Sequence, residues 1–187
     1  MLICGVDEAG RGALVGSVFA AAVILPKLFV ANGLKDSKKI TSKKRDYFYD
    51  LIIEKAVAWS IASANAQEID EINILQASLL AMQRAVFGLG VSPDLVRVDG
   101  NCVIDVSSDC EAVIGGDDLF LEISAASVLA KVARDREMVK LAKQIPGYGI
   151  EKHKGYATKQ HIEALFSLGV TKHHRRSFKP VSELVLR

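Results

Sequence analysis

The chain has 187 residues, of which 50% are hydrophobic and 25% are charged, with a formal net charge of +2. These values are ordinary for a globular chain that can bury a core, and they exclude a collagen-like or disordered sequence. The net charge is too small to identify a nucleic-acid binder, so the local distribution of basic residues matters more.

Membrane insertion and secretion are not expected. The longest apolar run, residues 13–25, is shorter than the roughly 18 residues of a membrane helix and is interrupted by a Gly-Ser pair. The first residues lack the basic segment and apolar core of a signal peptide. Cys4, Cys102 and Cys110 form neither a CxxC pair nor an even framework, so we expect reduced thiols in a cytoplasmic protein.

The chain begins with an apolar run, residues 2–7, that is typical of a buried strand. Gly-Arg-Gly at residues 10–12 predicts a tight turn, and residues 13–25 predict a second strand antiparallel to the first. The first run ends in two adjacent carboxylates, Asp7 and Glu8. Successive side chains of a strand face opposite ways. We therefore expect the strand to end at Asp7 and Glu8 to lie in the turn.

Strand and helix patterns alternate through the rest of the chain. Thr41 or Ser42 is expected to cap a helix that runs to Lys55, and a helix over 67–89 is expected to divide near Asn73. The remaining predicted helices cover 121–145 and 158–168, and the remaining predicted strands cover 57–64, 95–99, 103–106 and 112–114. This order indicates an α/β domain with a mixed sheet.

Pro146 and Gly147 stop the long third helix. We expect a catalytic core over residues 1–145 and a small helical C-terminal region over 146–187 that packs on the core and contributes to substrate binding.

Asp99 ends a second strand directly before a glycine, and Asp117 follows a third strand and a glycine turn. Ligand sites of open α/β sheets lie beyond the carboxyl ends of strands, so these acids and the Asp7-Glu8 pair are expected to converge. Four carboxylates at one place repel one another unless a cation neutralises them, and oxygen ligands favour Mg²⁺ or Mn²⁺ over zinc. Each acid alone is equally typical of a turn.

Several basic groups are compatible with a polyanionic substrate. Residues 35–46 carry six Lys or Arg and two Asp, a local charge of +4, which is also typical of a solvated helix start. Ser124, Ser127 and Lys131 share one face of the long helix, where hydroxyls and an ammonium suit phosphate oxygens. The alternative for a helical serine is a bond to its own backbone.

The C-terminal part contributes an aromatic residue and a basic group. Tyr156 follows a glycine close to His153 and Lys154, and it can stack on a base or sugar or lie as a partly buried loop aromatic. His-His-Arg-Arg at residues 173–176 can bind phosphate, although a metal site there lacks a spaced partner.

Together these motifs resemble the type 2 ribonuclease H family. The resemblance is carried by GVDEAGRG, DSK, DGN and ISAAS at residues 5–12, 36–38, 99–101 and 123–127. HKGY and HHRRSF at residues 153–156 and 173–178 are similar to the bacterial branch, ribonuclease HII. The matches run in order over nearly the whole chain. They imply an RNase H-like fold, with a mixed central sheet flanked by helices and a small helical C-terminal part.

The resemblance also implies roles for individual residues. The catalytic and metal-binding acids would be Asp7, Glu8, Asp99 and Asp117. Asp117 is chosen over Asp118 because it follows a glycine and precedes Glu-Ile-Ser at the family's spacing. The 10–12 turn would sense the ribose 2′-hydroxyl, and Tyr156 would stack at the ribonucleotide–deoxynucleotide junction. The substrate-binding residues would be Gly10, Arg11, Gly12, Lys38, Ser127, Lys131 and Tyr156.

Two positions depart from the family pattern. Ala13 stands where many members have proline, and the Gly-Gly-Asp-Asp segment at 115–118 has an extra glycine and acid where a lysine often precedes Gly-Asp.

The activity implied by the resemblance is Mg²⁺- or Mn²⁺-dependent endonucleolytic hydrolysis 5′ to a ribonucleotide, leaving 3′-hydroxyl and 5′-phosphate ends. The substrates would be RNA–DNA hybrids and duplex DNA with a single embedded ribonucleotide, in ribonucleotide removal during replication and repair, with no obligate protein partner. Two alternatives remain. A DNA exonuclease or recombinase of the same superfold would cut all-DNA duplex equally well, and a binding module would hold hybrid without cutting it.

Overall fold

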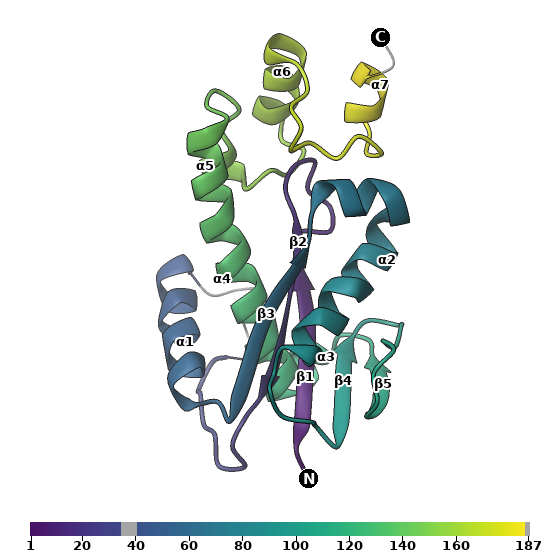
Figure 1. Cartoon of the computed structure of the whole chain (residues 1–187). Helices are drawn as coiled ribbons and strands as arrows, with labels where there is room; N and C mark the ends of the chain where they lie inside the picture. Colours follow the sequence, from purple (N-terminus) through teal and green to yellow (C-terminus); the bar gives the residue numbers. More distant parts are fainter. Residues whose placement is uncertain (35–40, 186–187) are drawn as a thin grey trace.

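In the computed structural model, which describes residues 1–34 and 41–185, five strands form one mixed sheet with helices on both faces (Figure 1). The strands are β1 Ile3–Ala9, β2 Val18–Ile24, β3 Ala58–Ala64, β4 Leu95–Asp99 and β5 Asp109–Val113. The helices are α1 Ser42–Lys55, α2 Ala66–Phe87, α3 Gly116–Leu119, α4 Leu121–Gln144, α5 Ile150–His153, α6 Lys159–Leu168 and α7 Val181–Val185. None of the helices in these ranges is both long and apolar enough to cross a bilayer.

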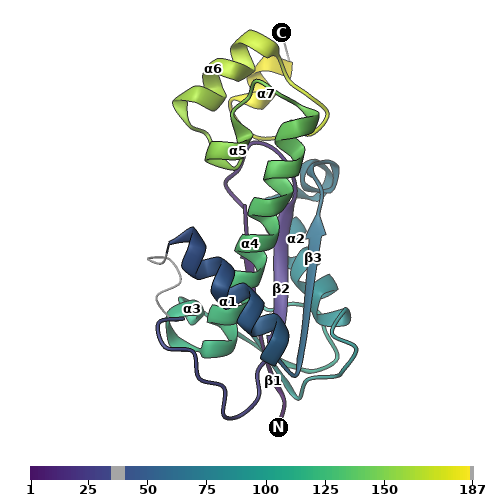
Figure 2. The ribbon, with the colours of Figure 1, turned by 90° about the vertical axis from the view of Figure 1, so that its left-hand side faces the viewer.

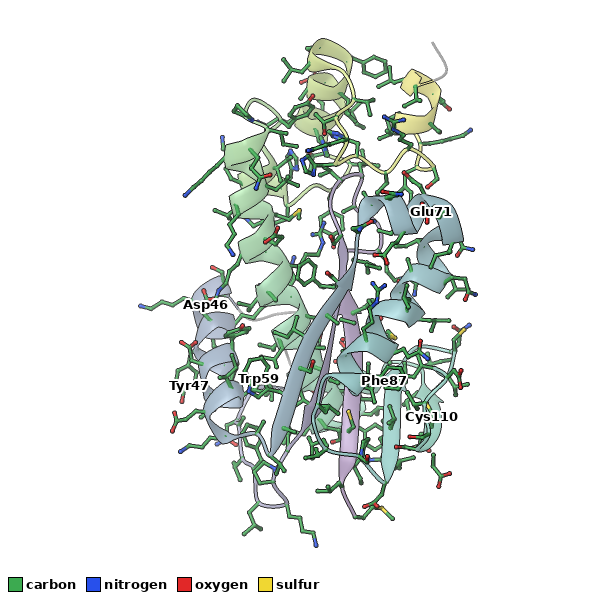
Figure 3. The ribbon with its side chains drawn as sticks, viewed as in Figure 1. Asp46, Tyr47, Trp59, Glu71, Phe87 and Cys110 are labelled. Carbon is green, nitrogen blue, oxygen red and sulfur yellow. The ribbon has the colours of Figure 1, made fainter. Side chains whose placement is uncertain are left out.

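Strand β1 lies at the centre of the sheet, whose order is β3-β2-β1-β4-β5. It pairs antiparallel with β2 and parallel with β4, and β4 pairs parallel with β5. Trp59 on β3 and Cys110 on β5 mark the two edge strands (Figure 3). Because β1, β4 and β5 are parallel, their carboxyl ends meet at one edge of the sheet, as predicted for the acids.

The core forms two layers, one on each face of the sheet. Helix α2 packs on one face, against alternate residues of β1, β2 and β4 that include Cys4 and Val6. Helices α1 and α4 pack on the other face, against Ala21 and Val23 of β2 (Figure 2). Small side chains let these layers come close, as at Gly5, where a Cβ would lie 2.2 Å from the backbone of α4.

Several local predictions are confirmed. The side chain of Thr41 accepts a hydrogen bond from Lys44 N at 3.3 Å and caps α1. Helix α2 is kinked at Asn73, which has a positive φ of 67°. The start of α2 is a capping box, in which Asn65 and Glu68 each accept the other's backbone N–H.

Three strand predictions are wrong. Strand β1 continues through Ala9, because its ladder with β2 extends to a final pair with Phe19. Strand β2 begins at Val18, because residues 13–17 bind the C-terminal region instead of the sheet. Residues 103–106 are not a strand, since the partner of β4 is β5; the hydrophobic residue Ile104 is buried against the α2 layer.

The three short helices α5–α7 cover one end of the sheet (Figure 1). Their core includes Tyr148, Ile150 and Leu165, and it also contains Leu14 from the loop after β1 and Met138 from α4. The C-terminal region and the first loop of the chain therefore share one hydrophobic cluster.

The protonation of two buried histidines in this region follows from their partners. His161 Nδ1 donates to the carbonyl of Tyr156 at 3.0 Å, so its Nε2 accepts from His174 Nε2 at 3.3 Å. His174 Nδ1 then accepts the N–H of Thr171 at 3.1 Å. Both rings are neutral in this arrangement, because a second proton would set two donors against each other. Burial is the main cause that lowers the pKa of His174 to about 4.

Substitution of Gly5 tests the close contact between β1 and α4. Gly5→Ala places a methyl group 2.2 Å from the carbonyl carbon of Glu122, so the helix must move, and we expect the free energy of unfolding to fall by about 1–3 kcal/mol. Gly12→Ala is the control, because its Cβ would meet nothing closer than 3.9 Å. Urea unfolding measures both, and equal stability of the two variants would contradict the assigned contact.

The histidine pair predicts a pH dependence of stability. His174 binds a proton more weakly in the folded protein, with a pKa of about 4 against an ordinary 6.5, so its contribution to stability is lost as the pH falls through this window. The free energy of unfolding of the wild type should fall between pH 7 and pH 5, and we expect this fall to be about 1–2 kcal/mol smaller in His174→Gln. Urea unfolding at both pH values, compared between wild type and variant, measures this difference. Identical pH slopes would contradict the assignment.

Candidate active site

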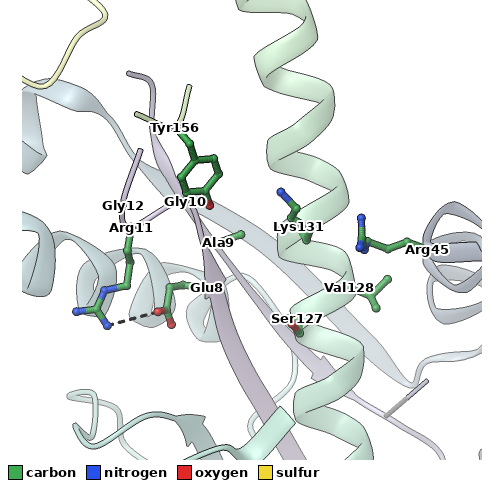
Figure 4. A pocket seen from close by; sticks show the side chains of 10 residues that line it. All are labelled: Glu8, Ala9, Gly10, Arg11, Gly12, Arg45, Ser127, Val128, Lys131 and Tyr156. Atoms are coloured by element: carbon green, nitrogen blue, oxygen red, sulfur yellow. Dashed lines mark hydrogen bonds and ion pairs between the residues drawn. The ribbon is translucent and has the colours of Figure 1, made fainter. Parts of the chain in front are cut away.

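A pocket of about 450 Å³ lies at the carboxyl end of β1, between the 10–12 turn, helix α4 and the C-terminal region. Figure 4 shows Tyr156 and Lys131 at one end of this pocket, Ser127 on the α4 side, and the Glu8–Arg11 pair across from α4. Its lining residues are Glu8, Ala9, Gly10, Arg11, Gly12, Arg45, Ser127, Val128, Lys131 and Tyr156.

Asp7 and Asp99 lie side by side on the α4 face of the sheet. The β1–β4 register pairs Val6 with Val98, and both valines face the α2 layer, so the next residue of each strand faces α4. Asp7 is only 5% exposed, and Ser127 of α4 donates a hydrogen bond to its carboxylate. Burial, followed by the negative charges of Glu8 and Asp99, raises the pKa of Asp7 well above its usual range.

Glu8 lies on the opposite face of β1, which corrects the prediction that it sits in the turn. Strand β1 extends regularly through Ala9, so Glu8 continues the series of residues that face away from α4. Its carboxylate accepts a hydrogen bond from Arg11 at 3.5 Å. Burial raises the pKa of Glu8, Arg11 opposes the increase, and Asp99 adds to it. Glu8 therefore interacts electrostatically with Asp99, as Asp7 does, although its side chain points away from α4.

Asp117 joins Asp99 through the turn that precedes α3. The N–H of Gly116 donates to Asp99 Oδ1 at 2.7 Å, which places the next residue, Asp117, beside the end of β4. Asp117 is 1% exposed, whereas Asp118 is exposed to solvent. Ser124 donates to the backbone carbonyl of Asp117 and fixes this turn against α4. Of the two adjacent acids, only Asp117 is enclosed by the site.

The acidic group has the chemistry of a divalent-cation site but is not closed around one point. Among the described residues, no three Asp, Glu, His or Cys side chains are placed to hold a metal together. Burial, followed by the negative charges of Glu8 and Asp99, nevertheless makes the charged form of Asp7 unfavourable, as its raised pKa indicates. A hard divalent ion would relieve this repulsion, and carboxylate oxygens are the ligands that Mg²⁺ and Mn²⁺ prefer. The donor set therefore fits such an ion after side-chain rotation.

Tyr156 and Lys131 form the upper rim of the pocket. The Tyr156 ring is 37% exposed, and the ammonium of Lys131 lies 5.8 Å from its centroid. Lys131 also pairs with Asp135 at 2.8 Å, so its charge is partly offset before any substrate binds. Both side chains are accessible from the pocket, as the prediction of substrate contact requires. Lys38, the other predicted phosphate ligand, lies outside the described residues.

Two suggestions from the sequence do not fit the structure. Ser124 is fully buried and donates to backbone carbonyls, including that of Phe120 one turn earlier, so it is not available to phosphate. The 173–176 group is not a continuous phosphate-binding surface, because His174 and Arg175 are buried. Of this group, only Arg176 is exposed.

Two buried arginines, Arg134 and Arg175, were not recognised from the sequence as parts of the site. Their donors bind carbonyl oxygens of the loop between β1 and β2. Arg134 also lies 5.4 Å from the Tyr156 ring, and a Cβ on Gly10 would lie 1.9 Å from its Nε. The position of Arg134 seven residues after Ser127 was the available signal, because that spacing returns to the same helix face.

The Ribonuclease HII family model matches residues 4–181. A ribonuclease HII of Neisseria gonorrhoeae is 56% identical over 186 residues, which cover 99% of this chain and 96% of that protein.

Two solved structures share the fold. The ribonuclease H2 of Pyrococcus horikoshii has a TM-score of 0.82 at 25% identity, over 98% of this chain and 97% of that chain. Bst-RNase HIII in complex with Mn²⁺ has a TM-score of 0.80 at 15% identity, over 100% of this chain and 70% of that chain. The predicted RNase H-like fold is thus confirmed, and the chain belongs to the ribonuclease HII family of ribonuclease H hydrolases.

Proposed function

We propose that this enzyme hydrolyses the phosphodiester 5′ to a ribonucleotide, in RNA–DNA hybrids and at single ribonucleotides embedded in duplex DNA. The products are a 3′-hydroxyl and a 5′-phosphate. The observation that carries this proposal is the position of the buried Asp7 and the partly buried Asp99 near the carboxyl ends of β1 and β4, close to a glycine turn that lines the pocket. In this proposal the acids support hydrolysis, and the glycine turn recognises the sugar.

Asp7, Asp99 and Asp117 would hold Mg²⁺ or Mn²⁺ on the α4 side of the sheet. Glu8 would join them through its carboxylate, which already interacts electrostatically with Asp99. When bound, divalent ions of this kind lower the pKa of water and neutralise charge on the leaving oxygen. Ser127 orients the carboxylate of Asp7 through its hydrogen bond.

Recognition of RNA requires contact with the 2′-hydroxyl, which DNA lacks. The backbone of the 10–12 turn lines the pocket, and its N–H groups are suitable donors to that hydroxyl. The Tyr156 ring, which lies next to Gly12, would pack against the sugar and base that follow the ribonucleotide. Lys131 would bind the neighbouring phosphate. This division of labour supports a role in removing ribonucleotides from DNA during replication and repair.

Removal of one buried charge tests the metal site. We expect Asp7→Asn to lower the cleavage rate of a duplex with one embedded ribonucleotide at least a hundredfold in Mg²⁺ or Mn²⁺. Asp118→Asn is the matched control, because Asp118 is an exposed acid next to Asp117. Its cleavage rate should stay within about threefold of wild type. An all-DNA duplex of the same sequence should not be cut. Equal activity of wild type and Asp7→Asn would refute the assignment.

Thermal unfolding provides a second measurement on the same variants. Without divalent metal, Asp7→Asn should unfold at a temperature no lower than wild type, because it removes buried charge repulsion. Added Mn²⁺ should raise the melting temperature of wild type and of Asp118→Asn more than that of Asp7→Asn. An equal increase in all three proteins would place the ion elsewhere.

The side chain of Arg11 is expected to matter less than the backbone around it. Its guanidinium side chain is 48% exposed and makes a single long contact with Glu8. We expect Arg11→Ala to keep the preference for ribonucleotide-containing over all-DNA duplex within about threefold. Tyr156→Ala should lower kcat/KM about ten- to a hundredfold through lost stacking, and Tyr156→Phe should restore it. Steady-state cleavage measures these changes, and a severe loss of selectivity in Arg11→Ala would show that the guanidinium itself reads the ribose.

A further inference from the structure

The buried guanidinium of Arg175 binds three carbonyl groups of one loop. Its Nε donates to the carbonyl of Gly16 at 2.9 Å, and its two terminal nitrogens donate to those of Arg11 and Gly10, each at 2.8 Å. Its backbone N–H donates to the carbonyl of Leu14, also at 2.8 Å. Arg175 is fully buried, so all of these bonds lie on the protein side of the loop.

These bonds determine where the amides of the turn point. A trans peptide is planar, and the C=O of one residue is antiparallel to the N–H of the next. When Arg175 binds the carbonyls of Gly10 and Arg11, the N–H groups of Arg11 and Gly12 must therefore point away from it. Arg11 and Gly12 are exposed and line the pocket, so the side opposite Arg175 is the pocket side.

We propose that Arg175 is a positioning residue for ribose recognition, which holds the turn carbonyls on the buried side so that the amides of Arg11 and Gly12 face the 2′-hydroxyl. This inference rests on the function proposed above and assigns its sugar selectivity to a residue that does not touch the substrate. A planar guanidinium suits this task, since one rigid group can donate to several oxygens at fixed angles.

Arg175 is itself held from the opposite side. The carboxylate of Asp70, on α2, accepts the N–H groups of Arg176 and Ser177, each at 2.9 Å, and the hydroxyl of Ser177 at 2.6 Å. The segment that carries Arg175 is thus fixed to α2 while the guanidinium reaches the turn. Burial, followed by the nearby charge of Arg134, lowers the pKa of Arg175 to about 9, so it remains a cation at neutral pH.

The test compares the affinity of each protein for two duplexes that differ only in one 2′-hydroxyl group. Each protein is titrated with a duplex containing one ribonucleotide and with the same duplex containing the matching deoxynucleotide, with divalent metal chelated so that nothing is cut. The ratio of the two dissociation constants measures sugar selectivity. Loss of folded protein changes both constants together, so this ratio separates positioning from a purely structural role.

Arg175→Met should reduce the ratio at least tenfold toward one, while affinity for the all-DNA duplex changes less than about threefold. Arg176→Met is the matched control, because it removes the same charge from the next residue, which is exposed. It should weaken binding to both duplexes equally and leave the ratio unchanged. A folded Arg175→Met protein with the wild-type ratio would overturn the proposal.

Two further variants keep the test decisive if Arg175→Met does not fold. Arg175→Lys retains the buried charge but has no planar fork, and Asp70→Ala releases the segment from α2 without touching the core. Both should lower the ratio, and wild-type ratios in both would overturn the proposal. A wild-type protein with a ratio of one would instead contradict ribose recognition itself, so failure of the inference and failure of the proposed function are distinguishable.

Discussion

The close contact between α4 and β1 at Gly5 determines the geometry of the whole site. It allows one face of α4 to run along the acids, the pocket and the C-terminal region in succession. The residues on that face are Ser124, Ser127, Lys131, Arg134 and Met138, which alternate at spacings of three and four. They contact the Asp117 turn, Asp7, the Tyr156 ring, the β1–β2 loop and the C-terminal core, in that order. At 1.5 Å per residue, this face spans roughly 20 Å, so the helix fixes the distance between the reacting group and the sugar-reading group.

Charges of opposite sign are buried on either side of the pocket, and each set is stabilised in a different way. The guanidinium groups of Arg134 and Arg175 are satisfied within the protein by carbonyl oxygens. The carboxylate of Asp7 is less favourably placed, because burial, followed by the negative charges of Glu8 and Asp99, raises its pKa. A buried charge without sufficient compensation is costly, so the acidic side is the part of the molecule that gains most from an added cation. Arg134 and Arg175 already have hydrogen-bond partners within the protein, so they can hold the neighbouring loop rigidly.

Local patterns in the sequence predicted the framework and part of the site. The placement of Asp7 close to Asp99 followed from acids at the ends of strands, and the cap at Thr41 and the kink at Asn73 followed from local chemistry. The strand extension through Glu8 was missed, because it depends on pairing with β2. Arg175 was misread as a phosphate ligand, since a His-His-Arg-Arg run resembles a solvated basic group. Its actual partners lie up to 165 residues earlier in the chain, a separation that no local pattern reports.

That separation has a consequence for folding. The turn that lines the pocket has its carbonyls bound by a side chain 164 to 165 residues later in the chain. The acids at the ends of β1 and β4 can be brought together once α4 exists, so the group assigned to metal is assembled earlier than the group assigned to the sugar. Long-range contacts of this kind form late in folding. The folding chain would therefore bring the acids together before Arg175 fixes the turn beside them.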